Sequence, residues 1–114
     1  MTVPRIPHRY LAKGYDEGAA TQDRTMPVVS MFYGVIVLMY FFDNRKHHQP
    51  HIHVKYQGEE AVISIPDGLV LEGKLRSSKL KLVLAWVEIH QDELMANWEL
   101  AIAGEQIFKI EPLR

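Results

Sequence analysis

Short strand-like segments separated by tight turns constrain the fold of this chain more than any other feature. β-Branched and aromatic residues dominate these segments, and Gly34 is a turn or bulge between the first two. The predicted strands are residues 28–32, 35–42, 51–57, 60–65 and 69–71. Pro66-Asp67-Gly68 is a strong turn signal. Because short turns join neighbouring antiparallel strands, we expect an antiparallel β-meander of about four to five strands.

The hydrophobic period changes after Gly73, where apolar residues begin to recur with helical spacing. The stripe consists of Leu80, Val83, Leu84, Val87, Leu94, Trp98, Ala101 and Ile102, and Gly104 follows as a helix terminator. An unbroken helix would be roughly 26 residues and about 39 Å long. Since this exceeds what a small sheet needs, the long C-terminal helix should project in part or break near residues 90–92. The predicted fold class is α+β.

The apolar segment 82–89 and the last residues suggest further contacts. Residues 82–89 are apolar almost all round, so this segment should bury more than one face, either under the sheet and the N-terminal arm or against a partner or a second copy. The basic residues near the helix start, Lys74, Arg76, Lys79 and Lys81, are either an anion site or ordinary surface charges. Residues 107–114 should dock as a short edge strand or as an extended cover.

A chain of 114 residues is expected to form one domain. Residues 1–25 contain prolines, glycines and mixed charges without a sustained period, so we interpret them as an N-terminal tail or arm. Residues 26–114 then form a single α+β domain. Met26-Pro27 is a candidate natural start, with the upstream part an extension.

Composition excludes several functional classes. The chain has no cysteine, which excludes disulfides, thiol catalysis and iron–sulfur ligation and fits a cytoplasmic protein. The longest apolar run, residues 28–42, is too short for a membrane span, and no signal peptide is recognised. The 13 basic and 14 acidic side chains leave a net charge of −1, so nucleic-acid binding would need a local basic patch.

Residues 47–56, with the sequence HHQPHIHVKY, contain four of the six histidines. His51 and His53 are two residues apart, so an extended strand projects both imidazoles from the same side. Pro50 suits the beginning of such a strand, and His47 lies in a loop that can fold back over the pair. We expect both rings to be open to solvent and within reach of cationic groups.

One interpretation of this cluster is a metal-independent site that acts on RNA, with no cofactor. The candidate catalytic residues are His47, His51, His53 and Tyr56. The candidate phosphate-binding residues are Arg45, Lys46 and Lys55. Imidazoles that titrate near neutral pH can exchange the proton of an attacking 2′-hydroxyl, and cationic side chains can stabilise the phosphate.

Two other interpretations of the histidines remain open. They can be structural groups on a half-exposed sheet face, satisfied by water, backbone carbonyls or acidic side chains. They can also bind zinc, copper or nickel, because imidazole is a common ligand for these ions. The H-x-H spacing alone is a weak metal signal, and a third ligand would have to come from Asp43, Glu59 or a loop histidine.

Several short motifs occur together between residues 26 and 113. They are MP (26–27), FYGVIV (32–37), MYF (39–41), PHxH (50–53), Tyr56, a DG turn (67–68), EGKL (72–75), Trp86 and NWEL (97–100). As a set they resemble a bacterial family known as domain of unknown function 4160, many of whose members look like H-x-P-P-H-x-H. Here His47 corresponds to the first histidine, Gln49 replaces one proline, and the loop from Asp43 is longer.

The resemblance implies little about biochemical activity. It implies a gene placed next to another small uncharacterised family, in an arrangement similar to toxin–antitoxin pairs, and it supports Met26 as the start. The leading hypothesis is therefore one component of a toxin–antitoxin-like pair, which acts on RNA and has a small protein encoded next to it as partner. The alternatives are a binding or regulatory module that forms homodimers through its C-terminal helix, and a histidine-based metal-binding protein.

Overall fold

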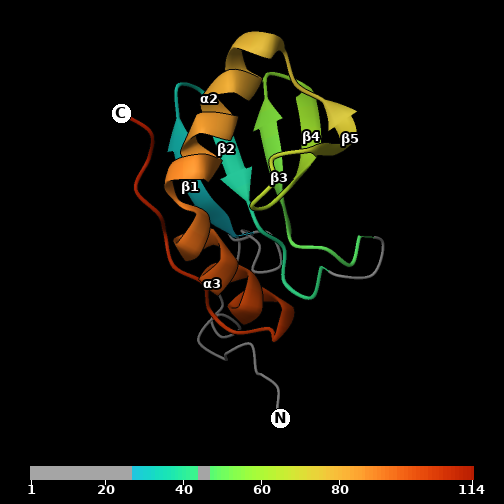
Figure 1. The fold of residues 1–114 in the computed structure, drawn as a ribbon, viewed down its shortest axis with the longest axis vertical. Coiled ribbons are helices and arrows are strands. Elements are labelled where there is room, and N and C mark those ends of the chain that lie inside the picture. Colours follow the sequence, from blue (N-terminus) through green and yellow to red (C-terminus); the bar gives the residue numbers. More distant parts are fainter. Residues whose placement is uncertain (1–26, 44–46) are drawn as a thin grey trace, which may run out of the picture.

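A computed structural model describes residues 27–43 and 47–114 of the chain. It contains five strands and two helices, in the order β1 (Val28–Phe32), β2 (Val35–Leu38), β3 (His51–Tyr56), β4 (Glu59–Ser64), β5 (Val70–Lys74), α2 (Ser77–Ile89) and α3 (Gln91–Ile102). The strands form one antiparallel sheet in the order β1-β2-β3-β4-β5, and both helices follow the sheet in sequence (Figure 1). The predicted α+β class and the meander are confirmed. The predicted N-terminal tail, residues 1–25, lies outside the described residues.

One face of the sheet forms the hydrophobic core with α2 (Figure 1). Val54 of β3 lies opposite Val37 of β2 in the sheet register, and both are fully buried. Trp86 of α2 packs against Phe32 of β1, with the ring centroids 5.3 Å apart. Since side chains alternate between the two faces of a strand, this packing assigns the even-numbered residues of β3 to the core face.

The opposite face of the sheet carries the histidines. His53 pairs with Leu38 on β2 and with Val62 on β4. His51 pairs with Ser64 at the end of β4. The same alternation that buries Ile52 and Val54 against α2 therefore sends His51 and His53 to the other side of β3.

The predicted helical stripe is divided between two helices, because the chain breaks at His90. This residue ends α2 and precedes α3 with φ −111° and ψ 29°, outside the helical region. Of the two arrangements expected for the long helix, the break near residues 90–92 is confirmed. Each helix buries part of the stripe, Val83 and Val87 in α2 and Leu94, Trp98 and Ala101 in α3, and α2 also buries Trp86, which lies off the stripe. The break therefore lets the second half of the stripe turn toward the end of the sheet where β3 begins.

Two predicted strand boundaries differ in the structure. β2 ends at Leu38 rather than at residue 42, because Phe42 has a positive φ of 57° and its amide bonds to the carbonyl of Ala101. β5 runs from Val70 to Lys74 rather than over 69–71. The C-terminal segment takes the form of an extended cover, in which the Ile110 amide donates to the Val29 carbonyl at 2.9 Å.

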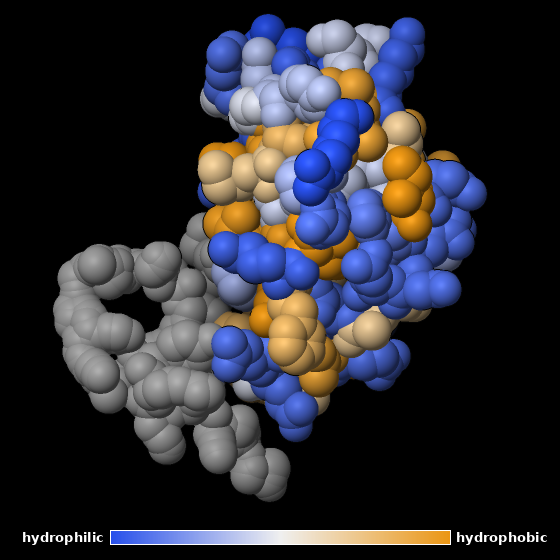
Figure 2. Space-filling view, turned by 90° about the vertical axis from the view of Figure 1, so that its left-hand side faces the viewer, coloured by the Kyte–Doolittle hydropathy of each residue, from blue (hydrophilic) through white to orange (hydrophobic). Residues whose placement is uncertain are grey.

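Apolar side chains also remain on the surface. The exposed large ones are Met31, Tyr33, Phe42, Leu69, Val70, Ile89 and Phe108. On the face drawn in Figure 2, apolar surface forms separate patches between polar side chains. Self-association through the C-terminal helices stays a prediction. No helix within residues 27–43 and 47–114 is long and apolar enough to cross a membrane.

Candidate functional site

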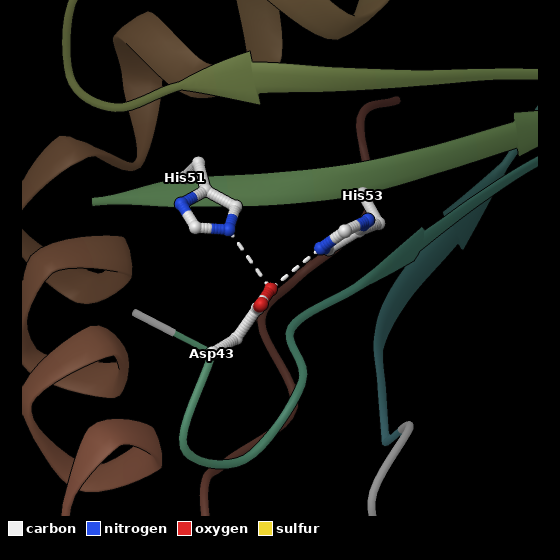
Figure 3. Close-up of side chains that lie close together, drawn as sticks. All are labelled: Asp43, His51 and His53. Carbon is white, nitrogen blue, oxygen red and sulfur yellow. Dashed lines mark hydrogen bonds and ion pairs between the residues drawn. The ribbon is translucent and has the colours of Figure 1, made fainter. Parts of the chain in front are cut away.

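One carboxylate oxygen connects the two histidines of β3. Asp43 lies in the loop between β2 and β3, directly after the turn at Phe42. Its Oδ2 atom is 2.8 Å from Nε2 of His51 and 2.6 Å from Nε2 of His53 (Figure 3). The predicted placement of both rings on one side of the strand is confirmed, and Asp43 is the acidic residue that meets them.

Burial differs among the three side chains. His51 is 1% exposed, whereas the side chains of His53 and Asp43 are 13% and 25% exposed. The expectation that both rings are open to solvent is therefore wrong for His51. The reason is α3, whose Trp98 ring packs against His51 with the centroids 4.9 Å apart.

The protons of His51 can be assigned from its partners. Nδ1 lies 2.8 Å from the carbonyl oxygen of Gln49, and because a carbonyl only accepts, Nδ1 must carry a proton. In the neutral ring Nε2 then has a lone pair, and this lone pair faces a carboxylate oxygen that also offers only lone pairs. The contact is favourable only if a proton, carried by His51 or by Asp43, or a metal ion lies between the two atoms.

The two ring nitrogens of His53 have different surroundings. Its Nε2 bonds to Asp43, but its Nδ1 is buried and has no hydrogen-bond partner among the described residues. A histidine that exchanges protons with a substrate needs a ring nitrogen that the substrate can reach. Neither nitrogen of His53 has this arrangement in the structure.

The three side chains have the composition and spacing of a metal site. One ligand atom each from Asp43, His51 and His53 lies within 4.8 Å of the others. A metal-binding histidine usually donates its second ring N–H to a backbone carbonyl or carboxylate, as His51 does to Gln49. Two imidazoles and one carboxylate leave coordination positions for water or substrate, as in catalytic zinc sites and non-haem iron sites.

Two further ring side chains, Tyr40 and His47, lie next to the cluster. Tyr40 stacks on His53, with the ring centroids 3.9 Å apart and an interplanar angle of 11°. Burial raises the pKa of Tyr40, and the charges of Glu60 and Asp43 raise it further. His47 approaches His51 edge-on at 5.5 Å, but its Nε2 atom pairs with Glu72 at 3.0 Å.

The remaining predicted site residues are distributed differently. Tyr56 is on the core face of β3, because its offset from His53 is odd, and it does not meet the histidine pair. Lys55 shares the histidine face, where its cross-strand partner is Glu60. Arg45 and Lys46 lie outside the described residues.

The basic residues near the start of α2 are engaged within the chain. The backbone amide and Nε of Arg76 donate to Oε1 of Glu59 at 2.9 and 3.3 Å. The hydrogen bond from the Arg76 amide is the main cause that lowers the pKa of Glu59. Lys79 donates to the Tyr33 carbonyl at 3.0 Å, and both cations lie over the Tyr56 ring. Glu59 therefore occupies the position predicted for an external anion.

Comparison with known proteins identifies the family. A family model described as domain of unknown function (DUF4160) matches residues 34–99, more than half of the chain. The chain belongs to this family. The DUF4160 match is shorter than the resemblance expected from residue 26 to 113, but it contains Asp43, His51 and His53. No curated protein and no solved structure matches the chain.

Sequence reasoning missed two residues of the site. Trp98 was assigned only to the helical stripe, because a possible break near residues 90–92 does not show in which direction the second half of the helix turns. Tyr40 was assigned to a longer β2, where its face was not determined. Residues 37–42 are all apolar or aromatic, so no alternation in the sequence indicated the face of Tyr40.

Proposed function

We propose that this chain binds a divalent transition-metal ion at Asp43, His51 and His53. The observation that carries the proposal is the hydrogen bond from Nδ1 of His51 to the Gln49 carbonyl, which directs the Nε2 lone pair toward Asp43. Imidazole and carboxylate ligands without a thiolate suit zinc, nickel, cobalt or iron(II). Of the functions considered for this chain, metal binding has the best geometric support.

The charges near the cluster also favour a cation over an anionic substrate. Asp43 is within hydrogen-bond distance of both rings, and Glu72 is bonded to the neighbouring His47. Lys55 faces Glu60 across the sheet, and Glu60 in turn faces Lys74. Opposite charges on directly paired residues offset each other. The described part of this face therefore lacks an excess of positive charge that would attract a phosphate.

The proposed ion would keep an accessible coordination position. His51 is buried against Trp98, whereas Asp43 and His53 are partly exposed. The open side of the ion would therefore lie next to Asp43 and His53. An ion with three protein ligands and a bound water can act as a Lewis acid or supply hydroxide. The proposed site therefore suits metal-assisted hydrolysis as well as simple metal binding.

Metal content of the purified protein tests the proposal. The untagged full chain should contain about one equivalent of a bound transition metal by elemental analysis, or take up one equivalent of Zn²⁺ or Co²⁺ in calorimetric titration. Asp43→Asn and His53→Ala should abolish this binding. His90→Ala is the matched control, because His90 also pairs with an acidic residue, Glu93, but lies outside the cluster. Wild-type protein that binds neither ion, or variants that bind like the wild type, would refute the metal site.

A second candidate function is the RNA-acting component of a toxin–antitoxin-like pair. Its support is the family resemblance, together with the placement of His53 and Lys55 on one partly exposed face. In this role the small protein encoded next to it would be the partner.

A further inference from the structure

The metal-site residues contact α3 through the ring of His51. His51 and Trp98 are 1% and 4% exposed, and their rings pack with the centroids 4.9 Å apart. The plane of an imidazole fixes the direction of its nitrogen lone pairs. Because the Trp98 ring contacts the imidazole at an interplanar angle of 55°, the position of α3 limits how the His51 ring can turn and so helps to determine whether Nε2 faces Asp43.

The loop that carries Asp43 is attached to the other end of the same helix. The amide of Phe42 donates to the carbonyl of Ala101 at 2.9 Å. The Phe42 ring also lies over Gly104, so closely that a Cβ atom added at Gly104 would be 2.3 Å from Cζ of Phe42. Asp43 is the next residue in the chain. The positions of two of the three proposed ligands, Asp43 and His51, therefore depend on contacts with α3 and with Gly104 just after it.

The break at His90 makes α3 a helix distinct from α2. His90 has non-helical torsion angles, so α3 does not continue the axis of the helix that packs on the core face. On its other side, α3 is bonded to the C-terminal segment through Asn97, whose side chain donates to the Phe108 carbonyl at 2.7 Å and accepts from the Phe108 amide at 3.1 Å. α3 and this segment can therefore dock as one unit.

From these contacts we infer that metal binding and the docking of α3 are coupled, so that the site acts as a metal-dependent clamp on the C-terminal part of the chain. The inference rests on the proposed metal site. An ion needs Asp43 and His51 on the same side and close to each other, and both residues contact α3 or the residues next to it. A ligand that binds one conformation better stabilises that conformation, and the coupling is reciprocal. Metal should stabilise α3, and loosening the α3 contacts should weaken metal binding.

Hydrogen exchange tests the first direction of the coupling. Amides of residues 91–102 in the full chain should exchange more slowly with Zn²⁺ than with a chelator, whereas amides of central β4 should change less. The same comparison in Asp43→Asn should show no effect of Zn²⁺, because this variant lacks a ligand. Unchanged exchange in residues 91–102 of a metal-loaded wild type would overturn the clamp while leaving the metal site intact.

Two glycine variants test the reverse direction. Gly104 and Gly58 both have positive φ angles, 76° and 85°, so alanine strains the backbone similarly at each. A Cβ at Gly104 would displace Phe42, whereas nothing lies within 4 Å of a Cβ at Gly58. Gly104→Ala should weaken Zn²⁺ binding about 5-fold or more, although residue 104 is not a ligand. Gly58→Ala should bind like the wild type.

The outcomes separate the two proposals. If the wild type binds no metal, the proposed function fails and the clamp fails with it. If the wild type binds metal but the two glycine variants have equal affinities, only the clamp is refuted. Should Gly104→Ala fail to fold, Trp98→Phe replaces it, with Phe32→Leu as control, because Phe32 packs against Trp86 on the core face. Equal Zn²⁺ affinities for these two variants would likewise refute the clamp.

Discussion

At the scale of single residues, Asp43 has the largest role in the site, because one of its oxygens contacts two imidazoles. The carboxylate compensates whatever cation lies between it and His51, proton or metal. His51 is buried, so the loss of this partner would leave a polar ring nitrogen unsatisfied in the interior. The stability of the metal-free protein should therefore depend on Asp43 as well.

We predict that Asp43→Ala, which leaves Nε2 of His51 without a partner, lowers the free energy of unfolding of the metal-free protein by about 2 kcal/mol. His47→Ala is the control. It removes an ion pair with a largely exposed Glu72 and should change stability by less than about 0.5 kcal/mol. Urea denaturation in the presence of a chelator measures both. Equal effects of the two substitutions would show that the carboxylate has no special structural role.

Tyr40 gives a prediction for alkaline pH. Its pKa is raised above the ordinary value of 10.0, first by burial and then by Glu60 and Asp43. As pH rises, the unfolded chain loses the phenolic proton before the folded chain does, so the free energy of unfolding decreases with pH. The stabilisation that the protonated Tyr40 contributes is fully present below about pH 10 and is lost as pH rises through its raised pKa.

The melting temperature should therefore decrease less steeply between about pH 9 and about pH 11 for Tyr40→Phe than for the wild type. The phenylalanine ring keeps the stacking on His53 but has no proton to lose. Tyr33→Phe, at the exposed turn between β1 and β2, should decline like the wild type. Parallel pH profiles for the wild type and both variants would contradict the assignment to Tyr40.

At the scale of elements, the β4–β5 pair depends on a glycine. Gly73 has a φ of 74°, and a Cβ atom there would be 2.1 Å from the backbone oxygen of Glu60. A backbone oxygen in a sheet cannot move aside as a side chain can. β5 also provides Glu72, the partner of His47, so its pairing supports the surroundings of the candidate site.

Gly73→Ala should destabilise the protein by roughly 3 kcal/mol, because it combines a strained torsion angle with a steric clash. Gly58→Ala has the same kind of strained torsion without the clash and should cost about 1 kcal/mol. Guanidinium denaturation of both variants tests this difference. Equal denaturation midpoints for the two variants would show that β5 can shift away from β4 without loss of stability.

The elements themselves were largely predictable from sequence. Alternation and tight turns identified the five strands, and the change of period identified the helical region. The break at His90 was one of two expected arrangements, since the lapse of the stripe there did not decide between a projecting and a broken helix. Packing decided it, because only a broken helix buries both Trp86 on the core face and Trp98 against His51.

At the scale of the whole molecule, the toxin–antitoxin hypothesis predicts an effect on growing cells. Expression of the full chain should arrest growth, and coexpression of the small protein encoded next to it should restore growth. The arrest should disappear with His53→Ala and persist with His90→Ala. Growth that is unaffected by the wild-type chain would remove the toxin hypothesis but would not affect the metal site. Light scattering of the two proteins, separately and mixed, would test the predicted homodimer and partner complex.

The sequence alone determined which residues form strands and helices and that His51 and His53 share one side of β3. These properties follow from local torsion preferences and from the two-residue period of a strand, so they need no knowledge of distant segments. Only the tertiary structure decided which acid meets the histidines and which ring is buried. Asp43, His51 and Trp98 come from a loop, a strand and a helix, and their meeting depends on how a turn at Phe42 and a break at His90 direct these elements. The electrostatics of the site arise from that meeting, because the carboxylate of Asp43 faces Nε2 of a buried His51 whose Nδ1 already donates to the Gln49 carbonyl.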